Sequence, residues 1–158
     1  MKLYHGSYVA VERPDVLHSR RNVDFGPGFY LTPLIDQAKS WCDKQFRRRG
    51  QAVLSIYELD DEVWKDAKTL VFEDYSADWL SFVVSCRKMR DTTDYDVVMG
   101  GVANDRVFNT VELFFDGLID FETAIDRLRY EMPNAQVCIR AQAIIDRYLH
   151  FKGSESLC

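Results

Sequence analysis

Alternating or clustered apolar residues predict short strands at six places along the chain. These segments are rich in β-branched and aromatic residues and lie at 2–5, 29–32, 52–59, 69–72, 95–99 and 135–140. Turn-forming residues bound them, and the run Asp-Phe-Gly-Pro-Gly at 24–28 leads directly into the second strand. We therefore expect sheet strands from both halves of the chain.

Apolar residues at helical spacing predict helices between most of these strands. We expect the first helix to have Thr32 as its N-cap and Pro33 at its first helical position, and to end at Gly50. The other expected starts are Ser76 or Asp78, Asn104-Asp105, Phe121 and Ala141. The polar segment 152–158 is expected to fray as a flexible tail. The pattern favours one domain of mixed α and β structure over residues 1–151.

Composition and charge narrow the class of protein. With 158 residues, 47% hydrophobic and 28% charged, the chain can form one core, which disfavours disorder and coiled coil. A net charge of -5 gives no general attraction to nucleic acid or an anionic membrane, although the basic run 47–49 could meet an acidic or nucleic-acid target. Because no stretch approaches the ~20 apolar residues of a membrane span, we expect a cytoplasmic protein that starts at Met1.

The cysteines indicate neither a metal site nor a redox pair. Cys42, Cys86, Cys138 and Cys158 are far apart and lack Cys-x-x-Cys or Cys/His spacing. We therefore expect reduced thiols and no metal, with Cys138 a small buried residue rather than a nucleophile.

Two segments carry the candidate chemistry. His5 precedes Gly6-Ser7 at a strand end, where an imidazole could donate to a ribose hydroxyl and a glycine backbone could pair with a carboxamide. Tyr30 follows two glycines and offers a flat ring for stacking. Taken alone, His5 could be a surface residue before an ordinary turn, and Tyr30 could simply alternate with Phe29 in a strand.

Taken together, these motifs resemble a known group of proteins. The chain looks like a bacterial family of ADP-ribosyltransferase-like domains of unknown function, in the diphtheria-toxin-like branch marked by His, Tyr and a third position that is usually Glu. The resemblance covers nearly the whole chain. It rests on segments 3–7, Arg21, 24–32, Gln37-Ala38, Trp41, 95–98, 101–105, Thr110 and 136–138.

The resemblance implies an α+β fold with a split, mostly antiparallel β-sheet core, flanking helices and NAD in the cleft. His5 would bind a ribose hydroxyl, the Gly6 backbone the nicotinamide amide, and Ser7 a nearby hydroxyl, while Tyr30 would stack on nicotinamide. The loop 14–22 would lie over the adenine side, with Arg21 a partner for the pyrophosphate. The other expected NAD contacts are Asp24, Phe25, Gly26, Gly28, Phe29, Thr32 and Asp105.

The third position departs from the usual pattern of this branch. The matching late strand offers Gln136, a neutral side chain that can orient a ribose but cannot act as a general base. Asp105, Glu112 and Glu131 are the acids that could replace the missing charge, although a helix cap better explains Asp105 and a solvated surface position better explains Glu112 and Glu131. Extension of an ADP-ribose polymer is therefore disfavoured.

The resemblance thus implies a mono-ADP-ribosyltransferase that uses NAD, needs no metal and modifies an unidentified acceptor, either protein or nucleic acid. It also suggests a bacterial toxin or effector with an antitoxin or regulatory partner. A catalytically weak NAD-binding module and a NAD glycohydrolase are the alternatives.

Overall fold

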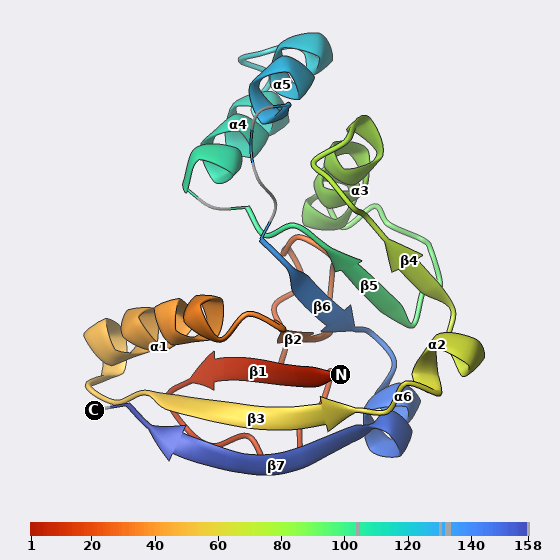
Figure 1. Cartoon of the computed structure of the whole chain (residues 1–158). Coiled ribbons are helices and arrows are strands. Elements are labelled where there is room, and N and C mark those ends of the chain that lie inside the picture. The colour runs from red at the N-terminus through yellow and green to blue at the C-terminus, as the bar shows by residue number, and fades with distance from the viewer. Residues whose placement is uncertain (104, 130, 132–133, 158) are drawn as a thin grey trace.

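The computed structural model describes residues 1–103, 105–129, 131 and 134–157, and within them the chain forms seven strands and six helices (Figure 1). The protein is therefore a mixed α+β structure. The strands are β1 (Lys2–Ser7), β2 (Phe29–Leu31), β3 (Val53–Leu59), β4 (Thr69–Val71), β5 (Val97–Gly100), β6 (Gln136–Ile139) and β7 (Leu149–Ser156). The helices are α1 (Ile35–Arg49), α2 (Val63–Asp66), α3 (Ala77–Arg87), α4 (Asp105–Phe115), α5 (Phe121–Leu128) and α6 (Gln142–Tyr148).

The strands form two sheets that are linked by an isolated backbone bridge and share one hydrophobic cluster. One sheet has the order β1-β3-β7 and is antiparallel, and the other has the order β2-β6-β5-β4, in which only β4 and β5 are parallel. The two edge strands β1 and β2 are joined by an isolated antiparallel bridge between Tyr4 and Thr32, with N···O distances of 2.8 and 2.9 Å. Figure 1 shows the two sheets inclined to each other, with the edge strand β2 between β1 and β6.

Side chains alternate between two hydrophobic clusters along β2, as the two-residue period of a strand requires. Phe29 and Leu31 belong to a cluster with β1, β3, β6 and α6. Tyr30, one residue between them, packs on the opposite face against the cluster that includes Phe25, Trp79 and residues of α3 to α5. A third, small cluster lies between α1 and the sheet β1-β3-β7.

Helix α1 begins later than the sequence predicts. Its N-cap is Leu34, which makes no side-chain capping bond, and Thr32 is still held in the bridge to Tyr4. The Thr32 hydroxyl donates to the Ala135 carbonyl at 2.7 Å and accepts from the Leu34 N–H at 3.1 Å. The prediction of Thr32 as N-cap is therefore wrong, because strand pairing holds this residue outside the helix. The predicted end at Gly50 is confirmed, in the left-handed conformation.

At α3 the structure decides between the two predicted caps. The Ser76 hydroxyl accepts from the Trp79 N–H at 3.1 Å, so Ser76 is the N-cap and Asp78 lies in the first turn. The sequence does not predict the short helix α2, because its four residues are too few to show a helical period.

The C-terminal segment forms a strand, where the sequence predicts a flexible tail. Residues 152–156 belong to β7, which pairs with the whole of β3 from Leu59↔Leu149 to Val53↔Ser156. This strand is mostly exposed and polar, and backbone hydrogen bonds to β3 order it. A strand without an apolar face leaves no periodic signal in the sequence, which explains why the sequence alone indicates a tail.

Among the described residues, no helix combines the length and apolar character needed to cross a lipid bilayer.

Candidate functional site at the junction of the two sheets

His5 lies on β1 beside the point where the two sheets meet. Its Nδ1 atom is 2.7 Å from the carbonyl oxygen of Tyr30. Since a carbonyl oxygen only accepts, Nδ1 carries the hydrogen, and Nε2 of the neutral ring is left as an acceptor. Burial lowers the pKa of His5 and so favours the neutral ring. The hydrogen bond to Tyr30 acts on this pKa in the opposite direction and is the smaller effect. A neutral His5 would therefore accept a hydrogen bond from a ligand hydroxyl and not donate one, contrary to the sequence-based expectation.

The backbone of Gly6 lies on the open edge of β1. Tyr4 directs its N–H and C=O away from β3 and toward Thr32. In an antiparallel strand the polar groups of every second residue point the same way, so Gly6 presents its N–H and C=O to the same edge. The bridge between Tyr4 and Thr32 is isolated, and β1 and β2 separate beyond it. At Gly6 this edge therefore carries a backbone donor and a backbone acceptor, and the glycine itself is buried.

Helix α1 covers β1 at Gly6 from one side. A Cβ atom on residue 6 would lie 2.4 Å from the Ala38 carbonyl oxygen and 2.9 Å from Cβ of Trp41. Only glycine therefore permits the helix to lie so close to the strand. Trp41 is half-buried beside Gly6, and the sequence gives it no specific role even though its segment is part of the resemblance.

The hydroxyl of Tyr30 both donates and accepts a hydrogen bond, which fixes the side chain. The hydroxyl donates to the Gly26 carbonyl at 2.6 Å and accepts from the Phe25 N–H at 3.0 Å. Burial raises the pKa of Tyr30 well above its usual value, so the phenol stays protonated. The ring of Tyr30 is half-buried. Tyr4 and Thr32 are cross-strand partners, so they share a face of the sheet. Gly6 lies two residues from Tyr4, and Tyr30 lies two residues from Thr32, so both lie on that same face.

The glycines before Tyr30 bring the turn 24–28 against β6. Gly26 has a φ of 76°, and a Cβ on residue 28 would lie 2.5 Å from Sγ of Cys138. Gly26 thus serves the backbone conformation of the turn, and Gly28 serves its close packing against β6.

Gln136 begins β6 and is nearly buried, with 4% exposure. Its Nε2 donates to Asp24 Oδ2 at 3.2 Å and to the Gly101 carbonyl at 3.3 Å. The other oxygen of Asp24 accepts two bonds from Arg87, from Nη2 at 2.6 Å and from Nε at 3.1 Å. Arg87 also donates from Nη1 to Glu112 at 2.6 Å. The sequence marks Arg87 only as a basic helix end, since nothing local links it to Asp24.

A cavity of about 490 Å³ opens at the start of α1. Residues 33–37, Ser40 and Asn134 line it. It adjoins Thr32 and Ala135, which are the chain neighbours of β2 and of Gln136. Its lining is mostly exposed, and it does not include His5, Gly6, Tyr30 or Gln136.

One comparison with known proteins bears on this arrangement. A family model described as "Protein of unknown function (DUF3990)" matches residues 1–151. The chain belongs to the DUF3990 family. The match includes β1, β2 and β6, and hence every residue of the junction. Neither the curated proteins nor the solved structures gave a match.

The DUF3990 chain brings part of the predicted site together. His5, Gly6, Tyr30 and Thr32 come together where β1 and β2 meet, and Gln136 lies on the adjoining strand β6. The His5 ring lies beside Phe29, and the Tyr30 ring packs on the opposite face of β2. Ser7 is half-buried at the end of β1.

Other predicted residues have structural partners or lie away from the junction. Phe25 is fully buried in the core, and Phe29 stacks beside His5 with ring centroids 4.6 Å apart. Arg21 is exposed on the long loop after β1, and part of that loop is held against α6, where Val16 N–H donates to Gln142 at 3.1 Å. Asp105 begins α4, but its side chain lies outside the part of the chain that is described.

The remaining acids and the cysteine have other functions in this fold. Glu112 is an ion-pair partner of Arg87, and Glu131 is one of Arg106 at 3.2 Å. Cys138 is fully buried, and burial raises the pKa of its thiol to about 12, which agrees with a packing role and leaves it unsuited to nucleophilic attack. Across the described residues, no group of three or more His, Cys, Asp or Glu side chains could hold a metal ion.

Proposed function

We propose that this DUF3990 protein binds NAD at the junction of β1 and β2 and transfers its ADP-ribose to one acceptor group, with release of nicotinamide. The observation that carries the proposal is the edge of β1 at Gly6, which turns away from β3, follows His5 and lies next to the segment of β2 that contains Tyr30. The resemblance in the sequence motifs supports the same assignment.

The nicotinamide end of NAD fits the chemistry of the backbone groups at this edge. A carboxamide has one acceptor and two donor hydrogens, so it can pair with both backbone groups of Gly6. The nicotinamide ring of NAD is cationic, and a half-buried aromatic side chain attracts such a ring by stacking and cation–π interaction. Tyr30 supplies one aromatic face, and Trp41 lies beside Gly6 on the same side of the sheet.

His5 suits the ribose. Its Nε2 is an acceptor as long as the ring is neutral, and a ribose hydroxyl is a donor. The hydrogen bond from Nδ1 to the Tyr30 carbonyl fixes both the tautomer and the direction of the ring.

The reaction we propose is dissociative. The bond between ribose C1′ and the nicotinamide nitrogen breaks, and its electron pair leaves with nicotinamide, which becomes neutral. The ribose then carries positive charge until an acceptor nucleophile bonds to C1′ and loses its proton to solvent. The side-chain oxygen of Gln136 would stabilise that charge as a dipole, which is weaker than a carboxylate. Such a site favours a single transfer over chain extension.

The second candidate function is NAD binding with little turnover. The neutral Gln136, with its amide hydrogens directed to Asp24 and Gly101, is the observation that favours it. The acceptor of a transfer would be a protein or a nucleic acid, and a role as a bacterial toxin or effector with a controlling partner belongs to the same proposal.

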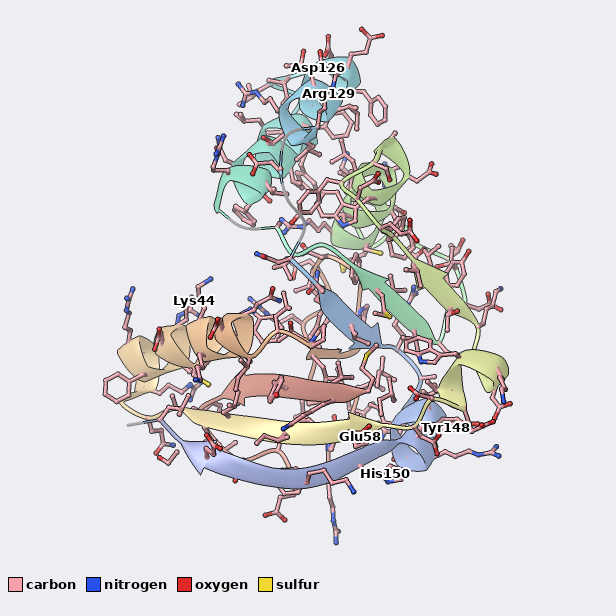
Figure 2. The ribbon with its side chains drawn as sticks, viewed as in Figure 1. Lys44, Glu58, Asp126, Arg129, Tyr148 and His150 are labelled. Carbon is pink, nitrogen blue, oxygen red and sulfur yellow. The ribbon has the colours of Figure 1, made fainter. Side chains whose placement is uncertain are left out.

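The test is calorimetry with NAD, followed by measurement of nicotinamide release and by labelling of a bacterial lysate with tagged NAD. We expect wild type to bind NAD, and His5→Ala and Tyr30→Ala to lose binding by about tenfold or more. His150→Ala is the matched control, because Figure 2 places His150 on β7, well away from the junction. Labelled lysate components indicate transfer, nicotinamide release without labelling indicates a glycohydrolase, and binding alone indicates the module. Unchanged NAD affinity in both site variants would contradict the proposal.

A further inference from the structure

We propose that Asp24, ion-paired to Arg87, is a positioning residue that fixes the amide of Gln136 and makes position 136 a site for an amide and not for a carboxylate. This inference rests on the proposed NAD function, because it explains how the third residue of that site is oriented. It adds Asp24, from a loop, and Arg87, from α3, to the group of residues that would stabilise the reacting ribose.

The two oxygens of Asp24 have separate partners. Oδ1 receives Nη2 and Nε of Arg87, at 2.6 and 3.1 Å. Oδ2 receives Nε2 of Gln136 at 3.2 Å. Both members of the ion pair are largely buried, with 13% and 12% of the side chains of Arg87 and Asp24 exposed. Arg87 therefore holds a carboxylate in a fixed position beside Gln136.

This arrangement permits only one orientation of the Gln136 amide. Nε2 has two hydrogens, and its two partners, Asp24 Oδ2 and the Gly101 carbonyl, can only accept. A rotated amide would place its oxygen against two other oxygens and lose both bonds. The Gln136 oxygen is thus directed away from Asp24 and Gly101, and it is the one atom of this side chain that can stabilise a positive charge.

Gln136 also lies on the correct face for this role. Tyr30 and Cys138 are cross-strand partners on β2 and β6, so their side chains share a face. Gln136 is two residues before Cys138 and therefore lies on the same face. The register Leu31↔Val137 shows that Gln136 is displaced from Tyr30 toward Thr32, where β2 meets β1.

A carboxylate at position 136 would conflict with Asp24. A glutamate at position 136 would place a carboxylate oxygen next to Asp24 Oδ2, where Gln136 Nε2 now donates a hydrogen bond. A further carboxylate, that of Glu112, contacts Arg87 from its other end. Like charges at this distance in a buried site repel strongly. The Asp24–Arg87 pair thus gives a physical reason why this chain has glutamine where the related branch usually has glutamate.

The test compares Asp24→Asn, Gln136→Glu and the combined variant, with the full chain as the starting protein. The combined variant exchanges the two groups, because an asparagine at position 24 can donate to a carboxylate at position 136. We expect Gln136→Glu and Asp24→Asn each to lower kcat for nicotinamide release by about tenfold, with a smaller change in KM, and the combination to recover most of the loss.

Asp91→Asn is the matched control for loss of a buried ion pair. Asp91 pairs with Arg140 at 2.6 Å beyond the opposite end of β6, and the two side chains are 10% and 13% exposed. The proposal is overturned if Asp24→Asn lowers kcat no more than Asp91→Asn does, or if Gln136→Glu alone raises kcat.

The free energy of unfolding, measured without NAD, separates this inference from the proposed function. We expect the effects of Asp24→Asn and Gln136→Glu on it to be non-additive, with the combined variant more stable than the sum of the single changes predicts. Additive effects contradict the pairing whether or not the protein uses NAD. A wild-type protein that fails to bind NAD in calorimetry contradicts the proposed function, and with it the claim that Asp24 acts in catalysis.

Discussion

Gly6 of β1 lies against Ala38 of α1 so closely that a Cβ on residue 6 would be 2.4 Å from the Ala38 carbonyl oxygen. The neighbouring Cys42 nitrogen would be 2.9 Å away, so the conflict is with helix backbone and no side-chain rotation relieves it. The strand and the helix therefore keep their spacing only while residue 6 is glycine.

Gly6→Ala should accordingly move α1 away from β1 and destabilise the protein by about 1–3 kcal/mol, as overpacking does elsewhere. NAD affinity should fall as well, since the strand edge at Gly6 would move relative to α1. Urea unfolding and calorimetry measure the two effects, and Lys44→Ala, on the exposed side of α1, is the control. A Gly6→Ala protein as stable as wild type would show that α1 is not held in this position.

The pH dependence of stability should report the burial of His5. Its pKa in the folded protein lies below the ordinary value of 6.5, so the unfolded chain takes up a proton at this position before the folded chain does. The contribution to stability is complete above pH 6.5 and is lost as the pH falls through the lowered pKa. NAD binding should weaken in the same direction, because a protonated Nε2 no longer accepts.

His5→Asn is the reference for this measurement. Its amide can donate to the Tyr30 carbonyl as Nδ1 does, but it does not titrate. Urea unfolding between about pH 5 and pH 8 should show the stability of wild type falling relative to His5→Asn as the pH is lowered. A constant difference between the two proteins would argue against the lowered pKa.

Tyr30 combines two functions that substitutions can separate. Tyr30→Phe removes the hydroxyl that joins Phe25 and Gly26 but keeps the ring, so it should cost about 1–3 kcal/mol of stability and leave most of the NAD affinity. Tyr30→Ala should lose both. Calorimetry on the two variants, with the exposed Tyr8→Phe as control, distinguishes the contributions. If both variants lost NAD affinity equally, the ring of Tyr30 would not be the surface on which nicotinamide stacks.

Removal of residues 152–158 should destabilise the protein. The deletion takes away the partners of four β3 residues, from Val53↔Ser156 to Ile56↔Gly153, and the contact of Leu157 with the cluster under α1. We expect a lower midpoint in thermal unfolding and faster proteolysis of β3, which would become an unprotected edge. The conservative control replaces Ser154 and Glu155 with Thr and Gln, which preserves the backbone pairing. Equal midpoints for the truncated and full chains would restore the view of a flexible tail.

The features that sequence predicts correctly here are local ones. The alternation of Phe29, Tyr30 and Leu31 indicates a strand with two faces, and Gly50 and Ser76 mark helix ends, because each signal depends on a few adjacent residues. The same holds for the glycines that let the turn 24–28 approach β6. The NAD site itself remains a proposal.

Features that depend on distant partners were not predictable. The pairing of Asp24 with Arg87 joins residues 63 positions apart, and neither has a local feature that points to the other. The hydroxyl of Thr32 makes it a suitable N-cap residue, yet strand pairing with Tyr4 holds it outside the helix. The strand character of residues 152–156 comes from the backbone of β3 and not from their own side chains.

The order of the strands also governs when the junction can form during synthesis. His5 and Tyr30 emerge from the ribosome early, but β6, which pairs with β2 and carries Gln136, follows about a hundred residues later. Until then β2 lacks its sheet partner, and β3 still lacks β7. A nascent chain therefore passes most of its synthesis with β1 and β2 present but without β6 and Gln136, and any activity at this site begins only after translation has passed β6.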